Sequence, residues 1–157
     1  SRYAHVWGWA SWRRAWRYFD EKMRLWPEAK QNEILRHWAD DWRFIRYWKN
    51  IFEKTAIGKT EAWSYQWNFA CWSQNGLSVV PSVNLVSNLG FSEKATHTTK
   101  KSQLAQMSIN SIKFPMNHPN LVVRHWKADR YVECQQFSRP ILSRFFRFIK
   151  RLIRLKY

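Results

Sequence analysis

Glycine, proline and cysteine are scarce in this chain: its 157 residues include four glycines, five prolines and two cysteines. So few turn-forming residues argue against an all-β protein, which needs a tight turn after almost every strand. Cys71 and Cys134 belong to no CxxC motif, so we expect two reduced thiols. No run of about 18 apolar residues is present, so the sequence predicts no transmembrane helix.

Acidic residues are also few, with 11 Asp and Glu against 27 Lys and Arg and a formal net charge of +16. The electrostatic field of a protein with this much positive charge attracts polyanions, which include nucleic acid, anionic lipid and nucleotide diphosphates. The charge is most concentrated in residues 137–157, which hold seven basic side chains and no acid. The rest of the chain, residues 1–136, has the size of one domain with its own core.

Residues 137–157 combine that charge with an apolar stripe that includes Ile141, Phe145, Ile149 and Leu152. This pattern predicts a basic amphipathic tail helix of the kind that lies in an anionic membrane interface. The alternative is a terminal helix that packs on the core and turns its basic face to solvent. With the membrane interpretation, we expect a cytoplasmic protein that is peripheral at the inner face of the plasma membrane.

Apolar residues at helical spacing predict several helices before residue 76 and one near the C-terminal end. Pro27 suits the first turn of a helix, and Asn75-Gly76 is a helix C-terminal signal. The expected helices cover residues 11–23, 28–52 as one helix or as two divided near Asp40, 60–75, and 125–135.

Two short segments depart from this pattern, because residues 77–80 and 83–86 are rich in valine and leucine and are separated by Pro81-Ser82. They predict a strand and an extended segment. Residues 87–103 are polar and predict a long loop. The expected fold class is therefore α/β, or α+β within this chain: helix-rich, with a few short strands.

Tryptophan is the abundant residue, and eleven of the twelve lie in the first 72 positions. A buried indole needs a partner for its N–H group, so dense tryptophan indicates either a stacking surface or an unusual aromatic core. Helical spacing assigns a first group to core packing, namely Trp12, Trp16, Trp38, Trp42 and Trp48. A second group consists of Trp7 and Trp9, which lie off this pattern, and of Trp63 and Trp67, which lie beside Gln66. This second group indicates a ligand-binding surface.

No GxGxxG, P-loop, GxSxG or HExxH motif is present. The chain does contain, in order, HVWGWASWRRAW at 5–16, WSYQW at 63–67, CWSQNGLSVVPSVNLVSNLGF at 71–91, ATHTT at 95–99 and FPMNHP at 114–119. Together these segments resemble the C-terminal half of bacterial nucleotide-diphospho-sugar transferases. This group is described as glycosyltransferase family 2-like or hemolytic protein HlpA-like.

The resemblance implies that residues 1–136 form the acceptor side of a GT-A transferase domain. The implied reaction moves a sugar from a nucleotide-diphosphate donor to a cell-envelope glycan or a lipid-linked acceptor. A divalent metal, Mg or Mn, would serve the full-length enzyme through an Asp-x-Asp motif in an N-terminal half. Asp40-Asp41 lies within a tryptophan-rich helical pattern and does not match that motif, so we expect the chain to be a fragment that is inactive alone.

The family pattern also places an aspartate where this chain has Ser64. An inverting transferase needs a carboxylate to accept the proton of the acceptor hydroxyl, and a serine cannot do this. Glu61 lies about one helical turn earlier and is the candidate replacement. A catalytically inactive remnant is the alternative.

The candidate substrate-binding residues include Trp7 and Trp9, which flank Gly8, where the backbone could approach a ligand closely. Arg13 or Arg14 could meet a diphosphate. The remaining substrate-binding candidates are His5, Trp63, Gln66 and Trp67.

His97 lies in the polar 95–99 segment and is the candidate metal ligand, because neutral imidazole binds metals well. A basic, aromatic-rich nucleic-acid-binding module is the competing function. We do not expect nucleic acid as a partner, because most of the aromatics follow core spacing and the basic residues concentrate in a tail with an apolar face.

Overall fold

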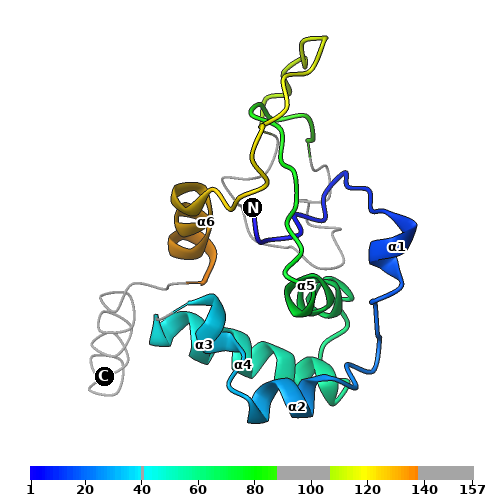
Figure 1. The fold of residues 1–157 in the computed structure, drawn as a ribbon, viewed down its shortest axis with the longest axis vertical. Coiled ribbons are helices and arrows are strands. Elements are labelled where there is room, and N and C mark those ends of the chain that lie inside the picture. Colours follow the sequence, from blue (N-terminus) through cyan, green and yellow to red (C-terminus); the bar gives the residue numbers. More distant parts are fainter. Residues whose placement is uncertain (40, 88–106, 138–157) are drawn as a thin grey trace, which may run out of the picture.

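The computed structural model describes residues 1–39, 41–87 and 107–137, and this part of the chain is helical (Figure 1). The two longest helices, α4 (Trp42–Ala56) and α5 (Ser64–Ser73), supply most of the buried hydrophobic residues. In chain order the elements are α1 (Arg13–Trp16), α2 (Trp26–Gln31), α3 (Leu35–Trp38), α4 (Trp42–Ala56), α5 (Ser64–Ser73), α6 (Trp126–Val132) and a π-helical turn η1 (Glu133–Phe137).

The expected strands are not found: the described residues contain no β-strand, so the α/β prediction, and with it the GT-A fold with a few short strands, is wrong. Residues 77–80 and 83–86 are extended but do not join a ladder. The amide of Ser78 donates to Ser1 O and that of Asn110 donates to Asn84 O, both at 2.8 Å. β-branched residues favour extended backbone, but a strand also needs a paired neighbour and a buried face. Val79 is 82% exposed.

Helix α4 follows directly from its sequence. Asp41 caps its N-terminus, with the side chain accepting a hydrogen bond from the Arg43 amide at 2.8 Å, as short acidic residues do at this position. One face then carries Phe44, Trp48 and Phe52 into the core at steps of four residues. Trp48 and Phe52 are 1% and 0% exposed, so the core assignment of Trp48 is confirmed.

For the preceding region the sequence allowed one helix over residues 28–52 or two helices divided near Asp40, and the structure has the division. Pro27 occupies the first turn of α2, where its missing N–H group would have had no partner in any case. The backbone becomes extended at Ala39, directly after α3. The predicted division near Asp40 is therefore confirmed, although the first half is two short helices and not one.

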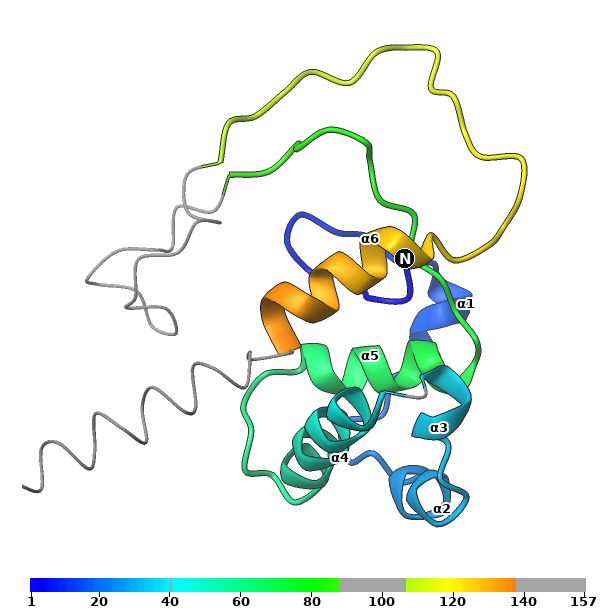
Figure 2. The ribbon, with the colours of Figure 1, turned by 90° about the vertical axis from the view of Figure 1, so that its left-hand side faces the viewer.

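Helix α5 lies across α4 in the middle of the molecule (Figure 2). Phe69 and Trp72 belong to the large core around α4, whereas Trp67 and Ala70 belong to a second cluster on the other side. The helix ends where predicted, with the Gly76 amide donating to Cys71 O at 2.8 Å. Helix α5 is therefore buried on both sides, and α4 is the helix that it contacts most.

The N-terminal segment runs beside α6 and over α5, and both views place it there (Figures 1 and 2). Tyr3 is 3% exposed and belongs to the large core. The helix predicted over residues 125–135 is confirmed as α6. The His125 ring caps this helix by accepting a hydrogen bond from the Ala128 amide at 3.2 Å.

The short first helix departs from the prediction of a helix over 11–23. After four residues the chain turns around Asp20, whose carboxylate accepts from the amides of Lys22 and Arg24 at 3.1 and 2.8 Å. Met23 then adopts a φ of +46°, which a right-handed helix does not allow. The core assignment fails for three tryptophans, because Trp12, Trp16 and Trp42 are 68%, 43% and 58% exposed.

The predicted domain of 1–136 and the tail of 137–157 meet at the end of the described chain. The predicted tail helix of residues 137–157 lies outside the described residues from residue 138 on. The predicted loop of residues 87–103 lies outside them from residue 88 on, and His97 is within that part. Among the helices that the structure describes, none has both the length and the apolarity that crossing a membrane would need.

Candidate ligand-binding groove

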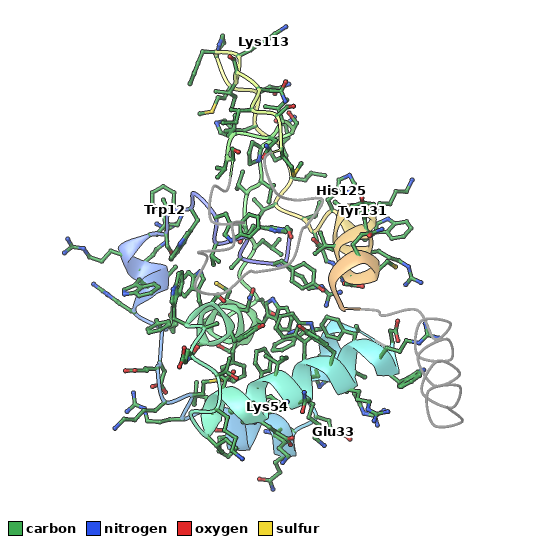
Figure 3. The ribbon with its side chains drawn as sticks, turned by 180° about the vertical axis from the view of Figure 1, so that it is seen from behind. Trp12, Glu33, Lys54, Lys113, His125 and Tyr131 are labelled. Atoms are coloured by element: carbon green, nitrogen blue, oxygen red, sulfur yellow. The ribbon has the colours of Figure 1, made fainter. Side chains whose placement is uncertain are left out.

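A groove of about 1510 Å³ runs between the N-terminal segment, α5 and the extended residues 76–86. Its walls are mostly apolar and aromatic, which is typical of small-molecule sites. The start of α1 forms one end, where Trp12 projects on the opposite side of the molecule from α6 and Tyr131 (Figure 3). The groove gathers most of the predicted substrate-binding residues, namely His5, Trp7, Gly8, Trp9 and Trp67, together with Ser64.

Trp9 and Trp67 belong to a cluster of four tryptophans at the groove. The ring centroid of Trp9 lies 5.2 Å from that of Trp63 and 5.7 Å from that of Trp67. Trp16 completes the cluster, 5.1 Å from Trp67, and stacks on Phe19 at 4.5 Å. The structure therefore brings Trp9 together with residues 54 and 58 positions later in the sequence, and it adds Trp16, which helical spacing had assigned to the core.

The side of Gly8 where a side chain would lie packs against Val86 and not against the open groove. Its φ is +58°, and a Cβ added there would lie 2.6 Å from Val86 Cγ2. The close approach predicted for Gly8 is thus made to the extended segment 83–86. Glycine is needed because it alone tolerates both this φ and this distance.

His5 also has a positive φ, of 44°. Its Nε2 lies 3.1 Å from Ser1 Oγ, and its ring meets the Tyr3 ring edge-on at 6.2 Å. Partial burial lowers the pKa of this imidazole. At neutral pH His5 is therefore an uncharged hydrogen-bonding group on the groove wall.

The three polar residues predicted at the site near the start of α5, Glu61, Ser64 and Gln66, do not all lie at the groove. Ser64 is half-buried at the start of α5 and lines the groove. Gln66 is 7% exposed, and its amide reaches main-chain carbonyls, of Glu21 in one orientation of the amide and of Ala62 in the other. Glu61 is exposed and is not among the described residues that line the groove. The structure therefore places Ser64 at the groove, and Gln66 and Glu61 elsewhere.

The groove is almost without charge. Among its described lining residues there is no Asp, Glu or Lys, and Arg14 is the one arginine. The Arg14 guanidinium lies over the Trp12 ring, 4.9 Å from the centroid. Cys71 also lines the groove, and burial raises the pKa of its thiol to about 11. This thiol is protonated at neutral pH and is a poor nucleophile.

A metal ion does not fit the described residues. Within residues 1–39, 41–87 and 107–137, no group of three or more His, Cys, Asp or Glu side chains gathers as metal ligands would. Mg or Mn needs oxygen ligands, usually carboxylates, and no Asp or Glu is among the described residues that line the groove.

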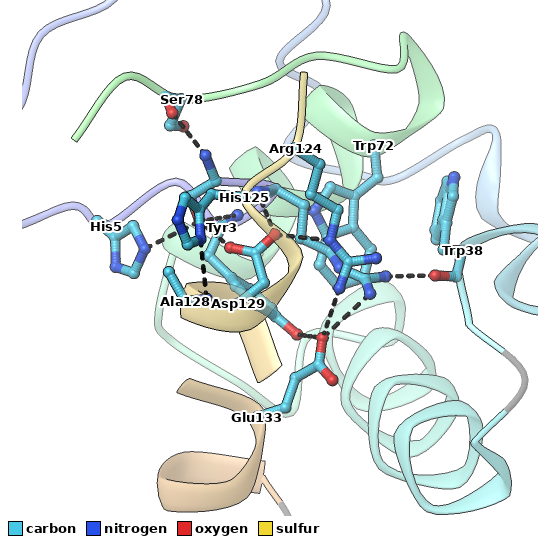
Figure 4. A network of polar contacts seen from close by, with 12 residues as sticks. Tyr3, His5, Trp38, Trp72, Ser78, Arg124, His125, Ala128, Asp129 and Glu133 are labelled. Atoms are coloured by element: carbon cyan, nitrogen blue, oxygen red, sulfur yellow. Dashed lines mark hydrogen bonds and ion pairs between the residues drawn. The ribbon is translucent and has the colours of Figure 1, made fainter. Parts of the chain in front are cut away.

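The sequence analysis did not predict a buried polar network that lies between the N-terminal segment and α6. Asp129 is 1% exposed, and it accepts hydrogen bonds from Ser1 Oγ at 2.6 Å, the Arg2 amide at 3.1 Å and Arg124 Nε at 2.7 Å. Glu133 in turn accepts from Arg2, from Arg124 and from the Tyr3 hydroxyl at 3.0 Å (Figure 4). The network joins the N-terminal segment, which forms one wall of the groove, to α6.

The charge state of Asp129 follows from its partners. Burial alone would raise the pKa of this carboxyl group, but the hydrogen bonds from Ser1, Arg2 and Arg124 outweigh burial and lower it. Asp129 is therefore ionised and is held as a structural carboxylate. The sequence held one signal for this network: in a basic chain with few acidic residues, those acids are expected to pair with arginines. That signal does not identify which residues pair.

No protein-family model matches the chain, and no curated protein or solved structure was found to be similar to it. What the groove binds must therefore be inferred from its own residues. Its main properties are exposed indole rings, scattered hydroxyl and amide groups, and very little charge.

Proposed function

We propose that the groove binds a carbohydrate, and that the protein serves as the acceptor-binding part of a nucleotide-sugar-dependent glycosyltransferase. The observation that carries the proposal is the pair of exposed tryptophans on the groove wall: Trp7 is 47% exposed and Trp12 is 68% exposed. Two large apolar rings left in contact with water beside a cavity mark a binding surface.

Indole rings suit sugars because the apolar C–H face of a pyranose packs flat on an aromatic face. Ring hydroxyl groups then need polar partners at the edge of the stack. Ser64, Asn68 and Gln74 line the same groove and offer hydroxyl and amide groups. Behind them, Trp67 is 4% exposed and packs against Trp9, which keeps the wall rigid before a ligand arrives.

The low charge of the groove favours a sugar over a nucleic acid. Channels that bind single-stranded nucleic acid combine stacking aromatics with a row of cations that follows the phosphates. Here Arg14 is the single Lys or Arg among the described lining residues, although the whole chain carries a formal charge of +16. The cations therefore lie mostly outside the surface that stacks.

The chemistry assigned to the described groove is binding and orientation. A nucleotide-diphosphate sugar would be the donor, and a cell-envelope glycan or lipid-linked acceptor would receive the sugar. This is in line with the resemblance of segments 5–16, 63–67 and 71–91 to such transferases. The tail of residues 137–157 would hold the protein at an anionic inner membrane surface, close to lipid-linked acceptors.

Glycan binding can be measured by isothermal titration and by quenching of tryptophan fluorescence with a panel of cell-envelope oligosaccharides. We expect Trp12→Ala and Trp7→Ala each to weaken binding by about five- to tenfold, since losing one stacked ring costs about 1 kcal/mol or somewhat more. Trp42→Ala is the matched control, because Trp42 is 58% exposed on α4 and away from the groove lining.

Equal losses in Trp12→Ala and Trp42→Ala would contradict a binding role for the groove. Tight binding of single-stranded DNA that depends on Trp7 and Trp12 would favour the nucleic-acid module instead. Glycan binding without donor-dependent transfer by the full-length protein would identify an inactive remnant that still recognises its ligand.

A further inference from the structure

Large apolar side chains lie exposed where the chain enters α6. Val122 is 90% exposed, and Leu121, Val123 and Trp126 are also exposed to solvent. Scattered exposed apolar residues are ordinary, but these four lie together within positions 121–126. A patch of this kind on a protein surface marks a contact with a membrane or with another molecule.

The outward face of α6 adds positive charge to this patch. Lys127, Arg130 and Tyr131 are spaced three and four residues apart, so they share one face of the helix, and all three are exposed. The acidic residues Asp129 and Glu133 lie on the opposite face, in the network with the N-terminal segment (Figure 4). Among the exposed residues of α6, Lys127 and Arg130 are therefore the charged ones.

This composition fits the interface of an anionic bilayer. Tryptophan and tyrosine rings gather at the level of the lipid headgroups, and Lys127 Nζ lies 5.8 Å from the centroid of the Trp126 ring. Lysine and arginine side chains beside such rings are attracted to anionic headgroups. The aliphatic residues 121–123 suit the boundary with the acyl chains, where their apolar surface leaves water.

A nucleic acid fits this surface less well. Surfaces that bind single strands combine cations with aromatic rings that stack on the bases. Val122 and its two neighbours are aliphatic and offer no ring on which a base could stack. A lipid surface uses both parts of the patch, whereas a nucleic acid would use the cations and leave the aliphatic residues in water.

We propose that residues 121–131 form a membrane-contact surface of the folded domain. Segment 121–123 enters the interface of an anionic bilayer, and Lys127 and Arg130 meet lipid phosphate groups. The proposal rests in part on the membrane association proposed for residues 137–157, which follow soon after with seven basic side chains and no acid. It differs in placing the domain itself, and not the tail alone, on the lipid.

Contact through this surface also orients the groove. Tyr131 and Trp12 lie on opposite sides of the molecule (Figure 3), and Trp12 lies at one end of the groove. A bilayer at Tyr131 therefore leaves the Trp12 end uncovered, so a glycan can bind while the protein is on the membrane. Membrane contact and glycan binding can thus be measured separately.

A polarity-sensitive fluorophore at position 122 tests whether the domain enters the lipid. It is attached through Val122→Cys in the full chain with Cys134→Ser. Burial raises the pKa of the Cys71 thiol to about 11, so this thiol reacts slowly, and Cys134→Ser alone measures its background labelling. Ile57→Cys is the matched control, because Ile57 is also exposed and β-branched and lies at the end of α4 remote from α6 (Figure 1).

With vesicles of phosphatidylcholine and phosphatidylglycerol, we expect the emission of the Val122→Cys probe to shift to shorter wavelength and to rise about twofold or more, because the probe leaves water. The Ile57→Cys probe should keep its aqueous emission. Vesicles of phosphatidylcholine alone should produce a much smaller change at position 122, because they lack the anionic headgroups that attract the cations.

Paired charge variants test the cations without any label. Lys127→Gln together with Arg130→Gln should weaken binding to the anionic vesicles about tenfold at about 100 mM NaCl, as measured by vesicle sedimentation. Lys54→Gln together with Lys59→Gln removes the same charge at exposed positions around the far end of α4. The affinity of this control should stay within about twofold of that of the parent protein.

A chain that sediments with the vesicles while its Val122→Cys probe keeps the aqueous emission would overturn the proposal, because the tail would then be the whole membrane contact. Equal weakening in the two double variants would also reject this surface. Binding of single-stranded DNA that needs Lys127 and Arg130, without any binding to vesicles, would assign the surface to nucleic acid instead.

The outcome for the groove is independent of these results. A complete absence of vesicle binding would reject both this surface and the membrane association of the tail. Failure of glycan binding in solution would contradict the groove proposal and leave the membrane-contact surface standing.

Discussion

At the scale of single residues, Asp129 shows how one carboxylate can hold two distant segments together. It sits on α6 and receives three hydrogen bonds, two of them from Ser1 and Arg2 at the other end of the chain. Its side chain is almost fully buried. Removing a buried charge of this kind leaves its partners without compensation, which is more damaging than the loss of one contact.

We expect Asp129→Asn to lower the free energy of unfolding by about 3–5 kcal/mol at pH 7. Because the folded-state pKa of Asp129 is lowered, its contribution is fully present above the unfolded-state pKa of about 3.9 and is lost as pH falls through the lower folded-state value. The parent protein should therefore lose stability in acid more steeply than the variant does. Urea unfolding followed at several pH values measures both effects.

Glu33→Gln is the matched control for this prediction. Glu33 pairs with Arg36 at 2.9 Å, but its side chain is 64% exposed, and exposed ion pairs contribute only about 0–1 kcal/mol. A loss in Asp129→Asn no larger than that in Glu33→Gln would show that the network around α6 is not a major source of stability.

The tryptophans show how far sequence reasoning reaches at this scale. Spacing correctly placed Trp48 in the core but also placed Trp12 and Trp42 there, and both are exposed. Periodicity reports which residues share a helix face, but not whether another element covers that face. Trp9, Trp63 and Trp67 are three of the seven predicted substrate-binding residues, and the ring of Trp9 packs against the other two.

At the scale of elements, the extended segment 83–86 is held against the N-terminal segment through Gly8. A Cβ at position 8 would come within 2.6 Å of Val86 Cγ2, and the φ of +58° is itself unfavourable for other residues. We expect Gly8→Ala to destabilise the protein by about 2–4 kcal/mol, part from the backbone and part from the clash. Thermal and urea unfolding would measure this loss.

Gly58 separates the two contributions. Its φ is +69°, but an added Cβ would meet nothing within 4 Å, so Gly58→Ala should cost only the backbone part, about 1 kcal/mol. Val86→Ala in the Gly8→Ala background should recover part of the clash. If Gly8→Ala and Gly58→Ala cost the same, segment 83–86 does not pack on Gly8 in solution.

The elements that could be predicted are those whose signals are local. Pro27 lies in the first turn of α2, and the Asn75-Gly76 pair ends α5. Segments 77–80 and 83–86 were predicted as strand-like because their residues favour extended backbone. Whether such a segment joins a sheet depends on a partner far away in the chain, and no local signal contains that information.

At the scale of the whole molecule, two aromatic clusters lie on opposite sides of α5, and the groove lies over one of them. The sequence indicated a dense aromatic interior but not its division by a central helix. The buried polar network depends on contacts of Arg2 with Asp129 and Glu133, separations of more than 120 positions. Contacts of that range cannot be inferred from spacing along the chain.

The distribution of charge over the whole molecule predicts how each kind of ligand responds to salt. The formal charge of +16 attracts any polyanion, and the affinity for single-stranded DNA should fall steeply as salt rises, because each neutralised phosphate releases counterions. A neutral glycan in the groove meets Arg14 as the one Lys or Arg of the described lining. Its affinity should therefore change by less than about twofold between about 50 and about 300 mM NaCl.

Titrations of the same preparation with a neutral oligosaccharide and with a single-stranded oligonucleotide at several salt concentrations measure the two slopes side by side. In Arg14→Gln the affinity for the neutral glycan should remain nearly independent of salt concentration. Arg14 can donate a hydrogen bond to the glycan, but a ligand without net charge releases no counterions when it binds. A steep slope for the glycan would mean that it binds through the basic surface and not in the groove. Competition by the oligonucleotide for the groove at high salt, where its electrostatic affinity is weak, would instead mean that the tryptophans stack on bases.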